Sequence, residues 1–240
     1  MYYRHEYKYI IHEGDRLALC SRLAPVLRRD RHADDRGGYH VRSLYFDDIY
    51  GSAIQNKVEG HAEREKYRIR FYNGSADAVR LERKEKNGGL IHKDGAALDP
   101  NELQQLLAGE AGALLHSEKP LLRRWATAAR TQLLRPVQLV DYRRRVFTLP
   151  EGNVRVTLDS RLRAPLRVDR DSLFAGGEPS LPALPAGISI LEVKYDAYLP
   201  KGVRQLLQLR HREWQAASKY VLCCLAARHT KENYAYATLS

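Results

Sequence analysis

The chain has 240 residues and a formal net charge of +11, with 44% hydrophobic and 29% charged residues. The apolar fraction is sufficient for the packed core of a soluble protein, and the length suits one large domain or two small ones. The positive surplus indicates a polyanionic partner such as a phosphorylated metabolite, nucleic acid or an anionic membrane surface, although a basic surface that only aids solubility gives the same charge.

Cysteine spacing and apolar run lengths exclude several further classes. Cys20, Cys223 and Cys224 lack a CxxC spacing, which argues against a structural zinc site or a disulfide framework and is consistent with a reducing, cytoplasmic location. The first ten residues contain no apolar segment typical of a signal peptide. The longest nearly unbroken apolar run, residues 220–227, is too short to cross a bilayer.

The spacing of apolar residues predicts elements along the whole chain. In the first half, residues 4–11 form a strand, residues 15–29 a helix, and residues 39–46, 65–72, 78–86 and 90–93 further strands. Asp99 and Pro100 then mark a helix start. In the second half, helices cover residues 99–106 and 121–134, strands cover 137–147, 153–163 and 188–195, and helices cover 202–209 and 216–227.

This order of elements predicts the fold class. Eight or nine strands, mostly connected as hairpins, indicate an antiparallel sheet or barrel with peripheral helices, which is an α+β arrangement. The stretch 176–187 is rich in Gly and Pro and is predicted to be a loop. Because no linker separates two halves, the sequence favours a single domain over residues 1–240.

Charged residues alternate with apolar ones along at least six predicted strands. Successive residues of a strand face opposite sides of a sheet, so residues two apart share a face. By this rule Arg68 and Arg70 share a face, as do Glu192 and Lys194. The other shared sets are Glu6 with Lys8, Glu82 with Lys84 and Lys86, Tyr142 with Arg144, and Arg155 with Thr157 and Asp159.

Such alternation usually directs the charged side of a strand toward solvent. Two features favour the opposite arrangement here: cations and glutamates recur as pairs two residues apart, and the intervening helices carry apolar stripes that need a sheet surface to cover. If those helices pack outside the sheet, the ionic faces line its interior, where they need pairing or a bound ligand. A metal–polyphosphate is such a ligand, because Arg and Lys bind phosphate oxygens and Glu binds the cation.

Seven short motifs resemble one known family. In chain order they are Tyr3-Arg-His-Glu-Tyr-Lys-Tyr, Ser43-Leu-Tyr-Phe-Asp, Lys66-Tyr-Arg-Ile-Arg-Phe-Tyr, Leu81-Glu-Arg-Lys, Val154-Arg-Val-Thr-Leu-Asp, Leu191-Glu-Val-Lys-Tyr and Ser218-Lys-Tyr. Together they resemble the VTC polyphosphate polymerase domain of the CYTH-like triphosphate tunnel metalloenzyme superfamily. The resemblance implies a closed eight-stranded antiparallel β-barrel, with peripheral helices and a basic tunnel.

The resemblance also implies the residues of the site. The residues expected to neutralise phosphate oxygens during catalysis are Arg68, Arg70, Lys84, Arg144 and Arg155, and Glu192 is expected to bind Mn²⁺ or Mg²⁺. The residues expected to bind the nucleotide phosphates or the chain are Lys8, Lys93, Tyr142, Lys194, Ser218 and Lys219. Arg4 stands where the triphosphate-hydrolysing branches have a glutamate, and this difference favours the polymerase branch.

The implied activity is transfer of the terminal phosphoryl group of ATP to a growing polyphosphate chain. Phosphoryl transfer requires positioning and charge neutralisation more than a protein nucleophile, which agrees with these residue types. A tripolyphosphatase or nucleoside triphosphatase on the same tunnel, or a non-catalytic module that binds polyphosphate or RNA, stays open. Nucleic acid is not the expected partner, because the cations are spread over many strands. Any membrane partner would be a separate polypeptide.

Overall fold

The computed structural model describes residues 4–88, 90–168, 173–174, 176–209, 213–214 and 217–237, with side chains described in these ranges except at 213–214 and 229–237. The start of the helix predicted at 216–227 therefore lies outside the described residues. Among the described residues, none of the helices has both the length and the apolar character needed to cross a lipid bilayer.

One antiparallel sheet organises the chain. Its long strands follow the order β1-β10-β8-β7-β3-β4-β5-β6. These strands are β1 (His5–His12), β3 (Tyr39–Asp47), β4 (Arg64–Tyr72), β5 (Arg80–Asn87), β6 (Leu90–Ala97), β7 (Arg135–Leu149), β8 (Val154–Pro165) and β10 (Ile188–Tyr195). Three short strands join it: β2 (Arg28–Arg29) pairs with β7, β9 (Ser180–Pro182) with β8, and β11 (Glu213–Trp214) with β1.

The sheet is not closed by backbone hydrogen bonds within the described part of the chain. There β6 pairs with β5 alone, and β1 pairs with β10 and β11. The predicted α+β class and the antiparallel pairing are confirmed, whereas the closed eight-stranded barrel is not.

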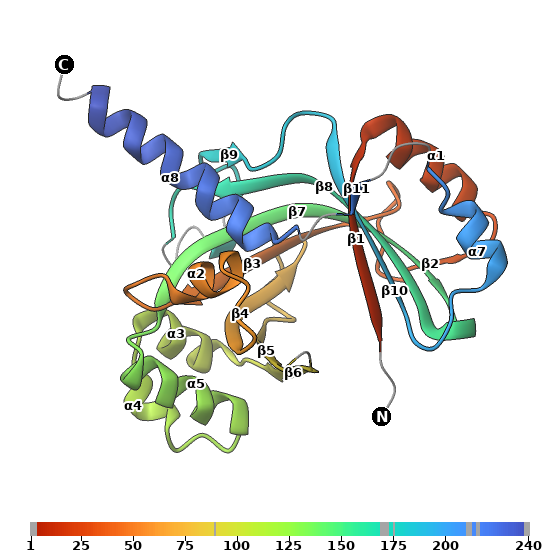
Figure 1. Ribbon diagram of the computed structural model, residues 1–240. Helices are drawn as coiled ribbons and strands as arrows, with labels where there is room; N and C mark the ends of the chain where they lie inside the picture. The colour runs from red at the N-terminus through yellow and green to blue at the C-terminus, as the bar shows by residue number, and fades with distance from the viewer. Residues whose placement is uncertain are drawn as a thin grey trace.

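Helices cover two separate areas of the sheet (Figure 1). The first group consists of α3 (Pro100–Ala108), α4 (Ala111–Leu114) and α5 (Pro120–Thr131), and the second of α1 (Glu13–Leu23) and α7 (Lys201–Leu206). A short helix, α2 (Ser52–Val58), follows β3, and a 3₁₀ turn, Glu151–Asn153, joins β7 to β8. The long helix α8 (Lys219–Ala237) crosses the sheet and contacts β7, β8 and β9.

Several predicted boundaries were wrong for identifiable reasons. The first helix ends at Leu23 rather than at residue 29, because Pro25 has no N–H to continue the helical hydrogen bonds, and Arg28–Arg29 instead form β2. The strand predicted at 90–93 continues to Ala97, since β5 offers it a continuous partner. The short elements α2 and β9 carry too few residues for a periodic signal and were missed.

Candidate functional site

The apolar sides of the strands pack against the helices. Tyr67, Ile69 and Phe71 of β4 share a buried cluster with residues of α5, including Trp125. In the second group, the apolar residues of β8 and β10 share a buried cluster with residues of α1 and α7; its members include Val156, Leu158, Leu191, Val193, Leu19, Leu23 and Val203. Because neighbouring residues alternate, the ionic sides of these strands face the opposite, inner side of the sheet. The helices therefore pack on the outer side of the sheet, and the ionic faces of the strands line its inner side.

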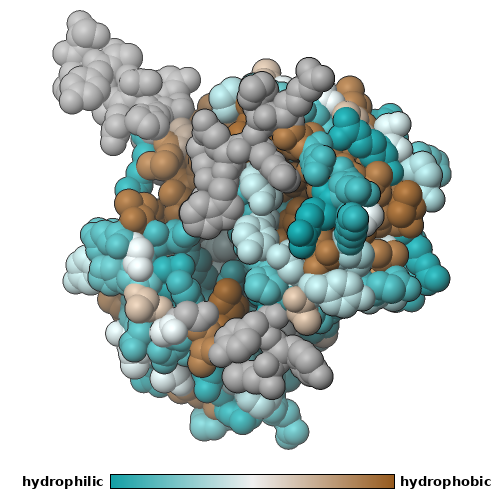
Figure 2. All heavy atoms as spheres, turned by 45° about the vertical axis from the view of Figure 1, so that its right-hand side comes forward, coloured by the Kyte–Doolittle hydropathy of each residue, from teal (hydrophilic) through white to brown (hydrophobic). Residues whose placement is uncertain are grey.

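The inner side of the sheet is curved, so that residues of distant strands interact. Glu6 on β1 and Lys84 on β5 interact electrostatically, although six strand positions separate these strands. In a flat sheet, with strands about 4.8 Å apart, the separation would be roughly 30 Å, far beyond the Debye length of about 8 Å. Figure 2 shows a recess near the middle of one face of the molecule, with hydrophilic side chains along its visible rim.

The first group of inner charges is centred on Glu82 of β5. Arg68 donates to Glu82 Oε2 from Nε at 2.9 Å and from Nη2 at 2.7 Å, and it also donates to the hydroxyl of Tyr45 at 2.9 Å. Arg70 contacts the other carboxylate oxygen, Oε1. Burial alone would raise the pKa of Glu82, but the two guanidinium groups outweigh burial and lower it. Glu82 therefore holds the two predicted arginines side by side.

The second group is centred on Asp159 of β8, whose side chain is 1% exposed. Arg144 donates to both oxygens of Asp159 at 2.7 Å, and Lys219 of α8 lies 2.7 Å from Oδ2. The ring of Tyr142 lies 5.2 Å from the guanidinium of Arg144 and 5.0 Å from the ammonium of Lys219. Burial would lower the pKa of Lys219, but Asp159 raises it, so this ammonium stays charged.

The third group joins β1 and β10. Lys8 lies 3.0 Å from Glu6, while Lys194 contacts Glu192 directly and lies 3.7 Å from Glu6. The side chain of Glu192 is only 6% exposed. Burial would raise the pKa of both glutamates, but the lysines dominate: the pKa of Glu6 falls to about 2, and that of Glu192 is also well below its usual range. Both carboxylates are therefore ionised at neutral pH.

Two predicted lysines lie on this inner side without a direct ion pair to any described carboxylate. Burial lowers the pKa of Lys84 to about 8, and it also lowers the pKa of Lys93, which is the β-sheet partner of Lys84 on β6. The ammonium groups of Lys8 and Lys194 lower the pKa of Lys84 further, whereas Glu6 opposes them. These two lysines are therefore weakly neutralised cations of the inner face.

Two predicted site residues are placed differently. Arg155, with a side chain 39% exposed, lies at the edge of the inner face, where its guanidinium is 3.9 Å from the carboxylate of Asp30. It remains next to the third group, because it is the β-sheet partner of Lys194. Ser218 precedes α8, and its backbone carbonyl accepts the hydrogen bond of Leu222 N–H at 3.0 Å. No described contact brings its hydroxyl to the other predicted residues.

Four further residues, Glu6, Glu82, Asp159 and Lys66, belong to the inner face but were not assigned a role from sequence. Alternation placed Glu82 beside Lys84 and Asp159 beside Arg155, yet pairing between strands is what joins these carboxylates to their arginines. Lys66 follows the same alternation as Arg68; burial lowers its pKa to about 8, and its ammonium lies 4.9 Å from the ring of Tyr220. In the sequence, Lys66 could have been placed on the inner face because it lies two residues before Arg68.

A divalent metal fits only one part of this surface. The described residues contain no group of three or more His, Cys, Asp or Glu side chains arranged to hold a metal ion. Glu6 and Glu192 do converge, and the ammonium of Lys194 lies between them as a cation. Two carboxylates are the protein ligand set that Mg²⁺ commonly uses when water and substrate phosphates complete its coordination. The pair therefore fits a metal that arrives with phosphate.

The fold and these three groups define an α+β protein with a cation-rich inner sheet face, a type of surface suited to binding phosphate oxygens. The family model of the VTC domain matches residues 3–228. The chain belongs to the VTC domain family.

The solved structures that the chain resembles have low sequence identity to it. The PH1819 protein from Pyrococcus horikoshii OT3 is 12% identical, with a TM-score of 0.45 over 91% of this chain and 97% of that one. A putative adenylate cyclase from Bacillus halodurans is also 12% identical, with a TM-score of 0.47 over 96% of this chain and 88% of that one. No curated protein matches the chain.

Proposed function

We propose that the chain is a metal-dependent polyphosphate polymerase, which transfers the terminal phosphoryl group of ATP to a growing polyphosphate chain. The excess of cations on the inner face is the observation that carries this proposal. The cations are Lys8, Lys66, Arg68, Arg70, Lys84, Lys93, Arg144, Lys194 and Lys219, and the carboxylates among them are Glu6, Glu82, Asp159 and Glu192. A bound linear polyanion would neutralise the excess positive charge and offset the unfavourable free energy of burying it.

The reaction requires an acceptor phosphate in line with the γ-phosphoryl group. An oxygen of the polyphosphate end forms the new P–O bond as the bond to the β-phosphate oxygen breaks, and ADP leaves with the electron pair. Arg68, Arg70 and Arg144 neutralise the oxygens of the transferring group, because their guanidinium forks are already fixed by Glu82 and Asp159. Preorganised charges of this kind need little rearrangement during the reaction.

The lysines and the metal complete the proposed site. Lys84 and Lys93, which lack a direct carboxylate partner, bind the polyphosphate chain. Glu192 and Glu6 would hold Mn²⁺ or Mg²⁺, which would neutralise charge on the nucleotide phosphates. Lys194, which contacts both glutamates, would then be available to bind a phosphate oxygen. In this proposal the inner face forms a closed tunnel through which the chain passes.

The experiment is an elongation assay with ATP labelled in its γ-phosphate and Mn²⁺ or Mg²⁺, resolved on a gel. A ladder of long chains supports the polymerase, whereas release of labelled orthophosphate alone identifies a hydrolase on the same surface. Arg70→Ala and Glu192→Gln should each lose most activity, while Arg124→Gln, on the exposed side of α5, should keep it. Full activity in the first two variants would refute the site. Binding of polyphosphate without any product would identify a binding module.

A further inference from the structure

A second cluster of arginines surrounds a small cavity on the outer side of the sheet. The cavity has a volume of about 240 Å³, and its lining includes Arg29, Asp35, Arg36 and Arg145. These arginines come from β2, from the loop before β3, and from β7. Arg145 follows Arg144 in the strand and therefore points away from the inner face. The cavity is thus separate from the proposed catalytic surface.

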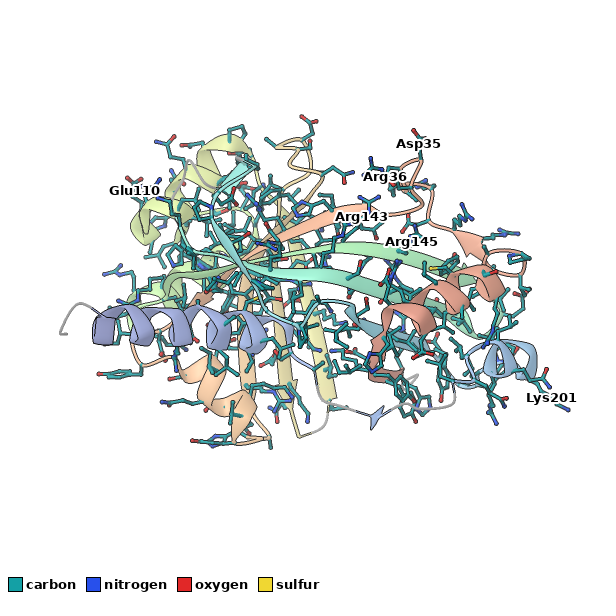
Figure 3. The ribbon with its side chains drawn as sticks, turned by 90° about the horizontal axis from the view of Figure 1, so that it is seen from above. Asp35, Arg36, Glu110, Arg143, Arg145 and Lys201 are labelled. Atoms are coloured by element: carbon teal, nitrogen blue, oxygen red, sulfur yellow. The ribbon has the colours of Figure 1, made fainter. Side chains whose placement is uncertain are left out.

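The loop that carries Arg36 is fixed to β7 by several contacts. Asp34 accepts hydrogen bonds from Arg143 Nη2 at 2.6 and 2.7 Å, and Arg145 Nη2 donates to the carbonyl of Arg36 at 2.7 Å. A Cβ atom on Gly38 would lie 2.6 Å from the carbonyl oxygen of Arg144, so only glycine allows this approach. Figure 3 shows Asp35 and Arg36 on this loop, near Arg143 and Arg145 of β7. The cavity wall is therefore preorganised.

Two of the guanidinium groups lie close to the position that a side chain on Gly37 would take. A Cβ atom at this position would lie 3.8 Å from Arg29 Nη1 and 4.0 Å from Arg145 Nε, so both nitrogens border the same gap. Within the described residues, neither Arg29 nor Arg36 forms an ion pair with a carboxylate. The Nη atoms of Arg145 donate to the Arg36 carbonyl and to Cys20 Sγ, whereas its Nε borders the gap and donates no described hydrogen bond. Three arginines against Asp35 leave a net positive charge.

We propose that this cavity is an additional binding site for a small phosphoryl anion, namely inorganic phosphate, pyrophosphate or the end of a polyphosphate chain. Arginine forks match phosphate oxygens in geometry as well as in charge. The volume is below the range of about 300–1,000 Å³ that holds drug-sized ligands, so a whole nucleotide is a poor fit. At about 30 Å³ per water molecule, the cavity has room for a phosphoryl group and part of its hydration shell. The site lies outside the catalytic groups, so its existence does not depend on the proposed activity.

The test is a titration of the intact chain, followed by the backbone amide signals of Gly37 and Gly38 and the Nε–H signals of Arg29 and Arg145 in ¹H–¹⁵N spectra. Separate titrations with orthophosphate, pyrophosphate and a short polyphosphate distinguish a free anion from a chain end. We expect saturable shifts of these four signals with at least one of the three probes. Absence of shifts with all three, in the unmodified protein, overturns the proposal.

Matched variants separate this cavity from the inner face. The double variant Arg29→Gln, Arg36→Gln should weaken the probe's affinity at the Gly37 signal by about tenfold or more, because two charged hydrogen-bond donors are lost. Arg124→Gln, which also removes an exposed positive charge, should leave that affinity unchanged. Equal weakening in both variants would indicate a general effect of net charge and would also overturn the proposal.

Discussion

The ammonium of Lys219, at the start of α8, lies 2.7 Å from Oδ2 of Asp159 in the middle of the sheet. The same carboxylate accepts two hydrogen bonds from Arg144. One buried carboxylate thus joins a helix to two strands and keeps two cations in place.

Replacing Asp159 by Ala should lower the free energy of unfolding by about 3–5 kcal/mol, because Arg144 and Lys219 would remain buried without their anion. Urea denaturation measures the loss. The control is Asp196→Ala, which removes a more exposed partner of Arg4 at 3.7 Å and should cost less than about 1 kcal/mol. Similar losses in the two variants would show that the Asp159 pairs contribute no more than a surface pair.

Glu82→Gln should tighten polyphosphate binding. The substitution keeps the shape of the side chain but removes the charge that competes with phosphate for Arg68 and Arg70. We expect the Kd to fall about tenfold, equivalent to about 1.4 kcal/mol, in calorimetric titrations. Glu85→Gln on the same strand removes a partner of Arg83 on the outer face, and its Kd should stay unchanged. Weaker binding by Glu82→Gln would contradict a competing role for this carboxylate.

Polyphosphate binding should weaken as the pH rises through about 8. The pKa of Lys84 lies at about 8 because of burial, and phosphate binds only its protonated form. Above this pH, binding must first take up a proton, so affinity falls by about tenfold between pH 7 and pH 9 for this group alone. The arginine in Lys84→Arg keeps its charge over this range, so the dependence of polyphosphate affinity on pH should become measurably weaker. An identical pH profile in both proteins would exclude Lys84 as its cause.

Gly38→Ala should destabilise the fold by about 1–3 kcal/mol, since its Cβ would meet the Arg144 carbonyl oxygen at 2.6 Å and force the loop from β7. Thermal unfolding provides the measurement. Gly14→Ala in α1 has nothing within 4 Å of its new Cβ and should be neutral or stabilise by up to about 1 kcal/mol. A harmless Gly38→Ala would mean that the loop adapts without cost.

Removal of divalent metal with a chelator should abolish product formation, and Mn²⁺ or Mg²⁺ should restore it. Glu192→Gln should raise the metal concentration needed for half-maximal activity by about tenfold, because one of two converging carboxylates loses its charge. Asp30→Asn, at the edge of the inner face near Arg155, is the matched control and should not change the metal requirement. Activity that persists after chelation would remove the metal from the proposed reaction.

The two-residue alternation of charge predicted much of the inner face. It grouped Arg68 with Arg70 and Glu192 with Lys194, because strand geometry alone decides which residues share a side. Which side is inner depended on the packing of helices, and the apolar stripes of the chain were sufficient to infer it. The approach of Lys219 to Asp159 was not predictable from periodicity, since it depends on where α8 crosses the sheet.

The pairing of strands was the part that local patterns left undetermined. Alternation gives no information on which strand neighbours which, so the sharing of Glu82 by two arginines and the convergence of Glu6 with Glu192 emerged only from the register. Predicted boundaries failed where a proline or a neighbouring strand decided the outcome, as at Pro25 and Ala97. The cavity beside Gly37 had no sequence signal, because its arginines lie on three separate elements.

The neighbouring position of β1 and β10 has a consequence for biosynthesis. His5 pairs with Tyr195, so about 190 further residues must be translated before β10, the principal partner of β1, leaves the ribosome. Until then its edge is unprotected and Glu6 lacks Glu192 and Lys194. Contacts so distant along the chain form slowly, so the inner face should be completed only in the last stage of folding, after the β3–β6 hairpins have formed.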